Sequence, residues 1–230
     1  MEETPAKDGS SPNELDGPRR KPERLAAFCD AVVAVAMTAL VLPLLDIHMS
    51  EFESFGALWA EYGSEFTAFV ASFLVIAVLW IIHHKIWIAV EHVTVSLLWA
   101  NIAWLSGILV IPFASIATWE ADKTPVLGFQ IYAIVMLYTT FWLGIIIYMI
   151  GNRPSVHGPG VVPQPLWFTL RYAGWWLIVM VACFVSPEDY GQTLLEWSAV
   201  AMIVLGWYRL PSQKRAAQRM RDEGVVVLLE

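Results

Sequence analysis

Residues 24–46 read RLAAFCDAVVAVAMTALVLPLLD, and this stretch decides the fold class. From Leu25 to Leu45 the residues are apolar or small, and Asp30 is the only charged one. A helix needs about 20 predominantly apolar residues to cross the hydrocarbon core of a bilayer. The stretch therefore predicts a transmembrane helix from Leu25 to Leu45.

Later segments of the chain are apolar enough to cross the same membrane. They are Phe66–Ile82, Val93–Thr118, Pro125–Ile150, Leu166–Ser186 and Thr193–Leu210. We therefore expect an all-α integral membrane protein with six transmembrane helices per protomer, the last two forming a hairpin. The fifth segment carries Arg171 near its start, and we expect this side chain to snorkel to the membrane interface.

The composition of the whole chain agrees with a membrane protein. Of 230 residues, 57% are hydrophobic and only 15% are charged, whereas about a quarter of the residues of a soluble domain are charged. This balance excludes a disordered chain, a nucleic-acid-binding domain and a disulfide scaffold. Cys29 and Cys183 lie in separate apolar segments without a CxxC partner, so we interpret both as buried free thiols.

The basic residues predict the orientation. With the N-terminus in the cytoplasm, every Lys and Arg except Lys123 falls on the inner side, as the positive-inside rule requires. We expect a multi-pass protein of the plasma membrane with both termini cytoplasmic. It would comprise a polar, basic leader (1–24), a six-helix transmembrane domain (25–210) and a basic tail (211–230). Acidic residues gather on the outer side, where they either concentrate cations or are simply tolerated.

Motifs for catalysis are absent from the sequence. It contains no HExxH, GxSxG, GxGxxG or P-loop motif, so we expect no enzyme, no cofactor and no tightly bound metal. The adjacent His83 and His84 would point about 100° apart on a helix and would not share one metal. Asp30 and Asn101 are polar residues inside predicted spans, and such residues mark either a functional site or a structural network. Candidate partners for Asp30 are Asn101, His83, His84 and Arg24.

Helical periodicity divides the first span into two faces. One face is small and apolar, with a single hydroxyl and an acid at its outer mouth: Ala31, Val35, Thr38, Ala39, Leu42 and Asp46. Asp30 lies roughly opposite, and a carboxylate at that depth avoids lipid, so we expect it to face the interior of the protomer as part of a structural network. The Thr38 face is then free for another subunit or for a pore, although ordinary helix packing would give the same pattern.

Several motifs resemble those of one known family. The heptapeptide RLAAFCD at 24–30 resembles the RxxxFSD signature of the lysosomal potassium channel family, transmembrane protein 175. The stretches WIIHH at 80–84, LWAN at 98–101 and PF at 112–113 resemble the WxxHH, LxN and PF positions of that family. The resemblance covers the first three spans by motif and the rest by topology, and the chain looks like a bacterial single-repeat member.

The resemblance implies a homotetramer in which the first helix of each subunit lines one central pore. It places the pore constriction at Val35, Thr38, Ala39 and Leu42. It also implies that a structural network holds the first helix against the second and third: Arg24, Phe28, Asp30, His84 and Asn101.

Three positions depart from the family pattern. Cys29 replaces the signature Ser, and a thiol is the weaker hydrogen-bonding group. Val35 and Ala39 are smaller than the usual Ile and Leu. Either the constriction is wider and less selective, or Leu42 becomes the main gate.

We therefore expect a passive, potassium-permeable cation channel. Four Thr38 hydroxyls would replace part of the hydration shell of a potassium ion passing near them, while apolar rings limit wetting. The expected partners are potassium, other monovalent cations, membrane lipids and further copies of the chain, but no nucleic acid. The alternative is a secondary transporter with a midplane site near Asp30, although the chain lacks the internal repeat that such folds use. A membrane enzyme using Asp30 and the His pair would lack a nucleophile or metal constellation.

Overall fold

The computed structural model describes residues 22–119, 125–158, 161, 165–185 and 197–207, with positions 218 and 222. The helices are α1 (Pro22–Ala39), α2 (Phe55–Trp87), α3 (Val95–Trp119), α4 (Pro125–Asn152), α5 (Leu166–Thr169), α6 (Arg171–Val185) and α8 (Ser198–Trp207). Two 3-10 helices, η1 (Leu42–Asp46) and η2 (Met49–Glu51), connect α1 to α2. Nearly all of the predicted leader and tail lies outside the described residues.

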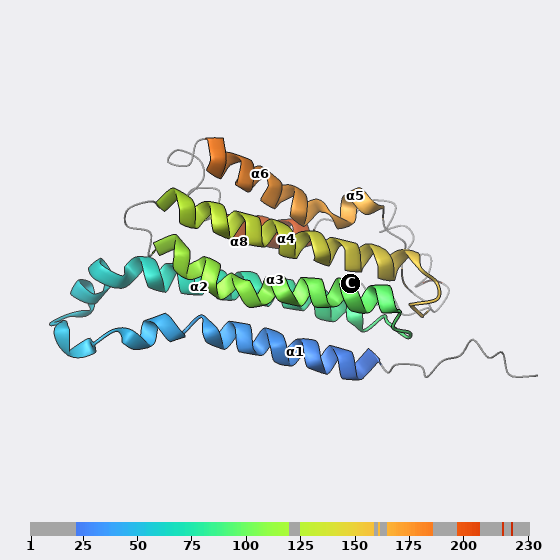
Figure 1. The fold of residues 1–230 in the computed structure, drawn as a ribbon, viewed down its shortest axis with the longest axis horizontal. Coiled ribbons are helices and arrows are strands. Elements are labelled where there is room, and N and C mark those ends of the chain that lie inside the picture. The colour runs from blue at the N-terminus through green and yellow to red at the C-terminus, as the bar shows by residue number, and fades with distance from the viewer. Residues whose placement is uncertain are drawn as a thin grey trace, which may run out of the picture.

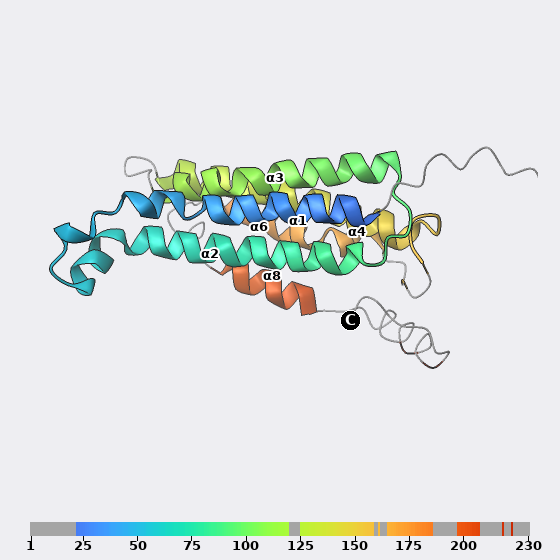
Figure 2. The same cartoon turned by 90° about the horizontal axis from the view of Figure 1, so that it is seen from below.

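The long helices run side by side along one axis (Figure 1). α1 lies at one edge of the bundle and packs against α2 and α3, while α4 packs between α3 and α6. The view from below places α1 between α2 and α3, with α8 on the far side of α2 (Figure 2). One side of α1 therefore contacts the protomer, and the other side lies on its outer surface.

Four segments are long and apolar enough to cross a membrane by length and composition: 22–51, 55–87, 95–118 and 126–152. They correspond to the first four predicted spans, and the chain is a membrane protein. Within the described residues α6 has 15 residues and α8 has 10, fewer than the about 20 that a complete span needs. The predicted fifth and sixth spans are represented by these shorter helices, and the 166–186 segment is interrupted at Leu170.

The first helix ends earlier than the sequence predicted. α1 stops at Ala39 instead of continuing to position 45. Pro43 has no backbone N–H and cannot donate to the carbonyl of Ala39, so the α-helical ladder breaks here. The amide of Val41 instead donates to the carbonyl of Thr38 over 3.2 Å, and the chain continues as η1. A projection at 100° per residue therefore holds up to Ala39 and no longer describes Leu42.

The second helix begins earlier than predicted, at Phe55 rather than Phe66. Its N-cap is Ser54, whose hydroxyl oxygen accepts a hydrogen bond from the amide of Ala57 over 3.2 Å. The 33 residues of α2 extend for about 50 Å, against about 30 Å of hydrocarbon in a bilayer. The added turns carry Glu61 and Glu65, which is why hydropathy alone missed them.

Arg171, which the sequence predicts to snorkel to the membrane interface, is bonded within the protomer. Its Nε donates to the carbonyl of Leu205 on α8 over 2.9 Å, and one Nη donates to the carbonyl of Phe168 over 2.8 Å. The guanidinium also lies over the rings of Phe168 and Tyr172, at 4.2 and 4.4 Å from their centroids. This cation therefore joins α5, α6 and α8, because backbone carbonyls and aromatic faces replace water around it.

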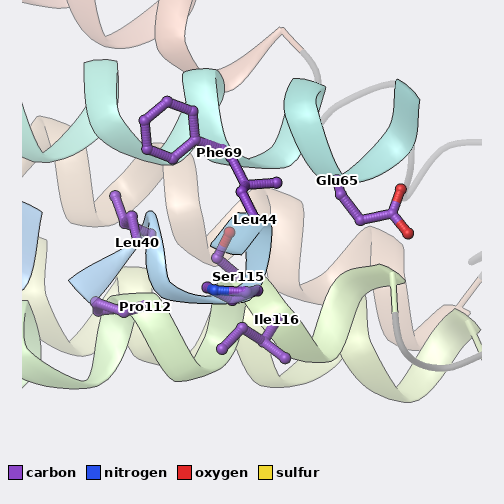
Figure 3. A pocket seen from close by; sticks show the side chains of 8 residues that line it. Leu40, Leu44, Glu65, Phe69, Pro112, Ser115 and Ile116 are labelled. Carbon is purple, nitrogen blue, oxygen red and sulfur yellow. The ribbon is translucent and has the colours of Figure 1, made fainter. Parts of the chain in front are cut away.

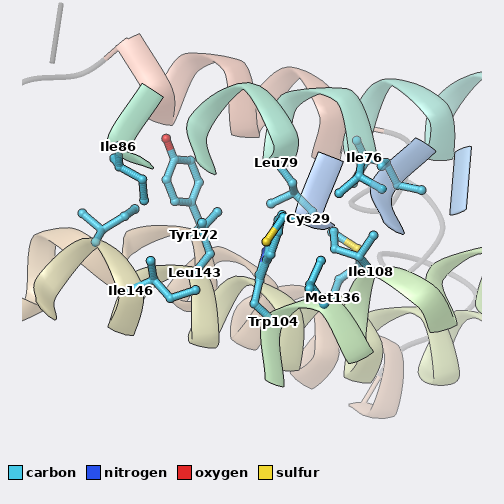
Figure 4. Packing of buried hydrophobic residues seen from close by; sticks show 14 of the residues in the cluster. Cys29, Ile76, Leu79, Ile86, Trp104, Ile108, Met136, Leu143, Ile146 and Tyr172 are labelled. Carbon is cyan, nitrogen blue, oxygen red and sulfur yellow. The ribbon is translucent and has the colours of Figure 1, made fainter. Parts of the chain in front are cut away.

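The core contains large side chains from α2, α3, α4 and α6, with Cys29 as a contribution from α1 (Figure 4). Glycines let the backbones approach closely, as is common between membrane helices. A Cβ at Gly128 of α4 would collide with the carbonyl oxygen of Ala117 on α3, and one at Gly107 of α3 would collide with the hydroxyl of Thr139 on α4. The α3–α4 contact therefore depends on two positions without a side chain.

Candidate pore-lining face and the network that anchors it

The residues of α1 and the turn after it separate into a covered face and an open face. The covered residues are almost fully buried against α2 and α3: Cys29, Val33, Ala36 and Leu40. On the open side Val35 is 61% exposed and Leu42 is 59% exposed. Ala31, Thr38 and Asp46 are also exposed. Ala39 alone of the predicted stripe is half-buried, at the border of the two faces.

Thr38 is the only hydroxyl on this open face of α1. Its Oγ1 donates to the carbonyl of Val35, three residues earlier, over 2.8 Å. The hydroxyl proton is therefore used inside the helix. Since a hydroxyl oxygen also has two acceptor lone pairs, Thr38 can still offer oxygen density to a cation outside the helix.

Asp30 is half-buried and turned toward α2. Its Oδ1 accepts a hydrogen bond from Nε1 of Trp80 over 2.8 Å. The carboxylate thus faces the interior of the protomer, as the periodicity predicts. Its partner, however, is none of the four candidates from the sequence. An indole N–H is a donor only, and the WxxHH motif contains the Trp that supplies it.

Asn101 of α3 is fully buried and connects three helices. Its Nδ2 donates to Sγ of Cys29 on α1 over 2.9 Å, and its Oδ1 lies 2.8 Å from Nε2 of His83 on α2. The ring of His83 stacks on Trp104 with a centroid distance of 4.1 Å and on Trp87 with 5.1 Å. We call Cys29, Asp30, Trp80, His83 and Asn101 the anchoring network.

The structure differs from the resemblance in the membership of this network. His83, not His84, lies against Asn101; His84 is exposed and packs on Trp80 at a centroid distance of 5.3 Å. Arg24 and Phe28 are exposed on the protomer and are not brought to the network. Cys29, Trp80 and His83 are the members that the resemblance did not supply. Helical spacing offers the signal for His83, because it falls four residues after the buried Leu79.

A small hollow lies beside the C-terminal end of α1 (Figure 3). It is lined by the turn after α1 and by facing positions of α2 and α3: Leu40, Pro43, Leu44, Glu65, Phe69, Pro112, Ser115 and Ile116. The hydroxyl of Ser115 pairs with that of Ser72 over 2.9 Å, and Ser72 lies 3.2 Å from the hydroxyl of Tyr132. The C-terminal end of α1 therefore borders an incompletely filled space, whereas hydrogen bonds hold its N-terminal half.

The described residues contain no cluster of three or more His, Cys, Asp or Glu side chains that could hold a metal ion. The open face of α1 and the turn after it is an apolar surface with one hydroxyl, that of Thr38, and a charged residue at each end. Residues 24–112, which contain the open face and the whole anchoring network, match the family described as the endosomal/lysosomal potassium channel TMEM175. This part of the chain is similar to the TMEM175 family.

Several known TMEM175 proteins and bacterial channels are similar to this chain. A protein named potassium channel from Streptomyces collinus is 27% identical over 175 residues, which are 71% of this chain and 84% of that one. A potassium channel from a Chryseobacterium species is 32% identical over 113 residues, or 47% of this chain and 55% of that one. The chicken protein named endosomal/lysosomal proton channel TMEM175 is 31% identical over 111 residues, and only 22% of its length is matched.

A solved structure shares the fold of this chain. It is the crystal structure of a lysosomal potassium-selective channel TMEM175 homolog from Chamaesiphon minutus. The TM-score is 0.64 at 20% sequence identity, over 80% of this chain and 96% of that one. The helix arrangement of Figures 1 and 2 is therefore a known fold of this family.

Proposed function

We propose that four copies of this chain assemble around α1 and form a central pore that passively conducts potassium. The observation that carries the proposal is the open face of α1, which the protomer leaves uncovered between α2 and α3. A single helix cannot enclose a pore, so a pore along this face requires several copies of it. The family and its relatives named as potassium channels supply the expectation of a channel.

The pore wall would be a series of rings of four identical side chains. Val35 and Leu42 supply apolar rings that restrict wetting, and Ala39 lies at the edge of the contact between neighbouring copies of α1. Between the apolar rings, four Thr38 oxygens compensate part of the cost of removing water from a potassium ion. Asp46 adds a ring of acids at the outer mouth, where it raises the local cation concentration.

The same chemistry lets potassium and other monovalent cations pass. The Thr38 hydroxyl ring favours a partly dehydrated cation but does not enclose it, so it does not restrict the pore to one ion. The basic residues of the sequence orient both termini toward the cytoplasm in a plasma membrane. The geometry favours a channel over a transporter with a site near Asp30. That carboxylate is bonded to Trp80 and turned away from the open face, so it is not placed to meet an ion in the pore.

Recordings from the purified protein in a planar bilayer test this proposal. With potassium on one side and sodium on the other, we expect discrete unitary currents and a reversal potential that favours potassium. Native mass spectrometry in mild detergent should show a tetramer. Stoichiometric coupled flux without unitary current would contradict a channel, and a monomer at micromolar concentration would contradict the assembly.

A further inference from the structure

Arg24 lies on the open face of α1, at its N-terminal end. Its side chain is exposed on the protomer. Eleven residues separate Arg24 from Val35, which is close to three full turns of 3.6 residues, so both project from the same side of the helix. The neighbouring Glu23 points about 100° away. Arg24 is therefore in line with the residues that we assign to the pore.

Arg24 and Asp46 mark the two ends of this face. With 1.5 Å per residue in α1 and about 2 Å per residue beyond it, they lie about 35 Å apart along the axis. The hydrocarbon core of a bilayer is about 30 Å thick. Both charges therefore fall near the water on opposite sides, and Val35, Thr38 and Leu42 fall between them.

We infer that Arg24 forms a cationic ring at the inner mouth of the pore and makes potassium current smaller in the outward than in the inward direction. This inference rests on the proposed tetrameric channel. A positive ring lowers the potassium concentration where outward current begins, and the Asp46 ring raises it where inward current begins. One unit charge about 8 Å from an ion in water changes the local ion concentration roughly two-fold. The Arg24 ring thus changes the ratio of outward to inward current without contacting the Thr38 ring.

The ratio of outward to inward unitary current in symmetric potassium chloride tests the inference. We expect Arg24→Gln, which removes four charges from the tetramer, to raise this ratio by at least about two-fold at 0.1 M salt. The effect should be smaller at 1 M, where the Debye length falls to about 3 Å. Arg24→Lys keeps the charge and should keep the ratio of the unsubstituted chain. Arg153→Gln is the matched control, because Arg153 is a cation that follows α4 and bonds Ser96 of α3. It should leave the ratio unchanged.

A second experiment avoids effects of substitution on folding. In an assembled Arg24→Cys channel with Cys29→Ser and Cys183→Ser, thiosulfonate reagents of opposite charge are applied from the inner side. Applied to separate channels, the anionic reagent should raise outward current and the cationic reagent should lower it. If unitary currents are present but the ratio of outward to inward current changes neither in the Arg24→Gln variant nor with the reagents, the inference is overturned. The proposed channel itself would not be contradicted by that result. Absence of unitary current from the unsubstituted chain would overturn the channel and this inference together.

Discussion

Trp80 of α2 donates its indole N–H to the carboxylate of Asp30 on α1 over 2.8 Å, and this bond turns the one charge inside the first span away from the open face of its helix. Next to it, Asn101 bonds Cys29 of the same helix. Two adjacent residues of α1 are thus held by two different helices. This arrangement fixes the rotation of α1 about its own axis, and hence which residues face outward.

Substitution of Asp30 tests that role. Asp30→Ala leaves the half-buried indole N–H without an acceptor, and we expect a loss of about 1–3 kcal/mol of stability. Asp30→Asn keeps an acceptor oxygen and should lose less. Tetramer yield and thermal unfolding in detergent measure both variants. A stable Asp30→Ala tetramer with altered ion selectivity would instead place Asp30 in the pore and contradict the assigned orientation of α1.

The Thr38 ring is tested by a change of similar shape. Thr38→Val keeps the volume but removes four oxygens from the tetramer, so the preference for potassium over sodium should fall. Thr38→Ser retains the oxygen and should retain most of the preference. Reversal potentials between potassium and sodium solutions give the measurement. Equal selectivity in the Val and Ser variants would exclude the hydroxyl as a determinant.

Leu40 and Leu42 are close in sequence but opposite in exposure, which makes them a matched pair. Leu40 is buried at 5% exposure, so Leu40→Ala should cost about 2–5 kcal/mol of stability. Leu42→Ala should leave stability nearly unchanged and raise unitary current by widening an apolar ring. Thermal unfolding and single-channel recording together separate the two effects. The assignment fails if the Leu42 variant unfolds easily and conducts no better.

Cysteine accessibility reports on the whole face. After Cys29→Ser and Cys183→Ser, cysteines introduced at Val35, Thr38 and Leu42 should be modified by a pore-permeant thiol reagent and block the current. Cysteines at the buried Val33 and Ala36 should react slowly or not at all. Block at all five positions, or at none, would remove α1 as the pore lining.

Substitution of Gly128 tests the α3–α4 contact, and Gly174 of α6 serves as the control. Gly128→Ala introduces a Cβ that meets the carbonyl oxygen of Ala117, so the helices must separate and stability should fall. At Gly174 of α6 a Cβ has no heavy atom within 4 Å, and Gly174→Ala should be neutral or stabilise by about 0.5–1 kcal/mol through helix propensity. Thermal unfolding of the two variants compares them directly. If the two variants had similar stability, the close approach at Gly128 would not limit the packing of α3 against α4.

Hydropathy predicted the first four spans because length and apolar composition are local properties of the sequence. It placed the end of the first span too late, since an apolar run does not reveal that Pro43 breaks the backbone ladder. It placed the start of the second too late, because Glu61 and Glu65 lower the hydropathy of a segment that Ser54 caps as a helix. The environment of Arg171 could not be predicted from hydropathy either, because it depends on a contact with Leu205, 34 positions later in the sequence.

Periodicity was enough to divide α1 into its two faces and to turn Asp30 inward. It did not identify Trp80 as the partner, because a hydrogen bond between helices depends on their relative rotation and height. The resemblance favoured His84 where the structure has His83, and adjacent helical residues differ by about 100° in direction. Which of two adjacent histidines joins the network therefore depends on the residues packed around them, here Trp104 and Asn101.

The supports of α1 are distributed unevenly along its length. Near its N-terminal end Cys29 and Asp30 are bonded to α3 and α2, while Leu40, just after the helix, lines the hollow of Figure 3. A tilt of α1 about its bonded end would displace Leu42 further than Val35, because Leu42 is the more distant from that end. In the proposed pore, such a tilt would therefore change the width most at the Leu42 ring.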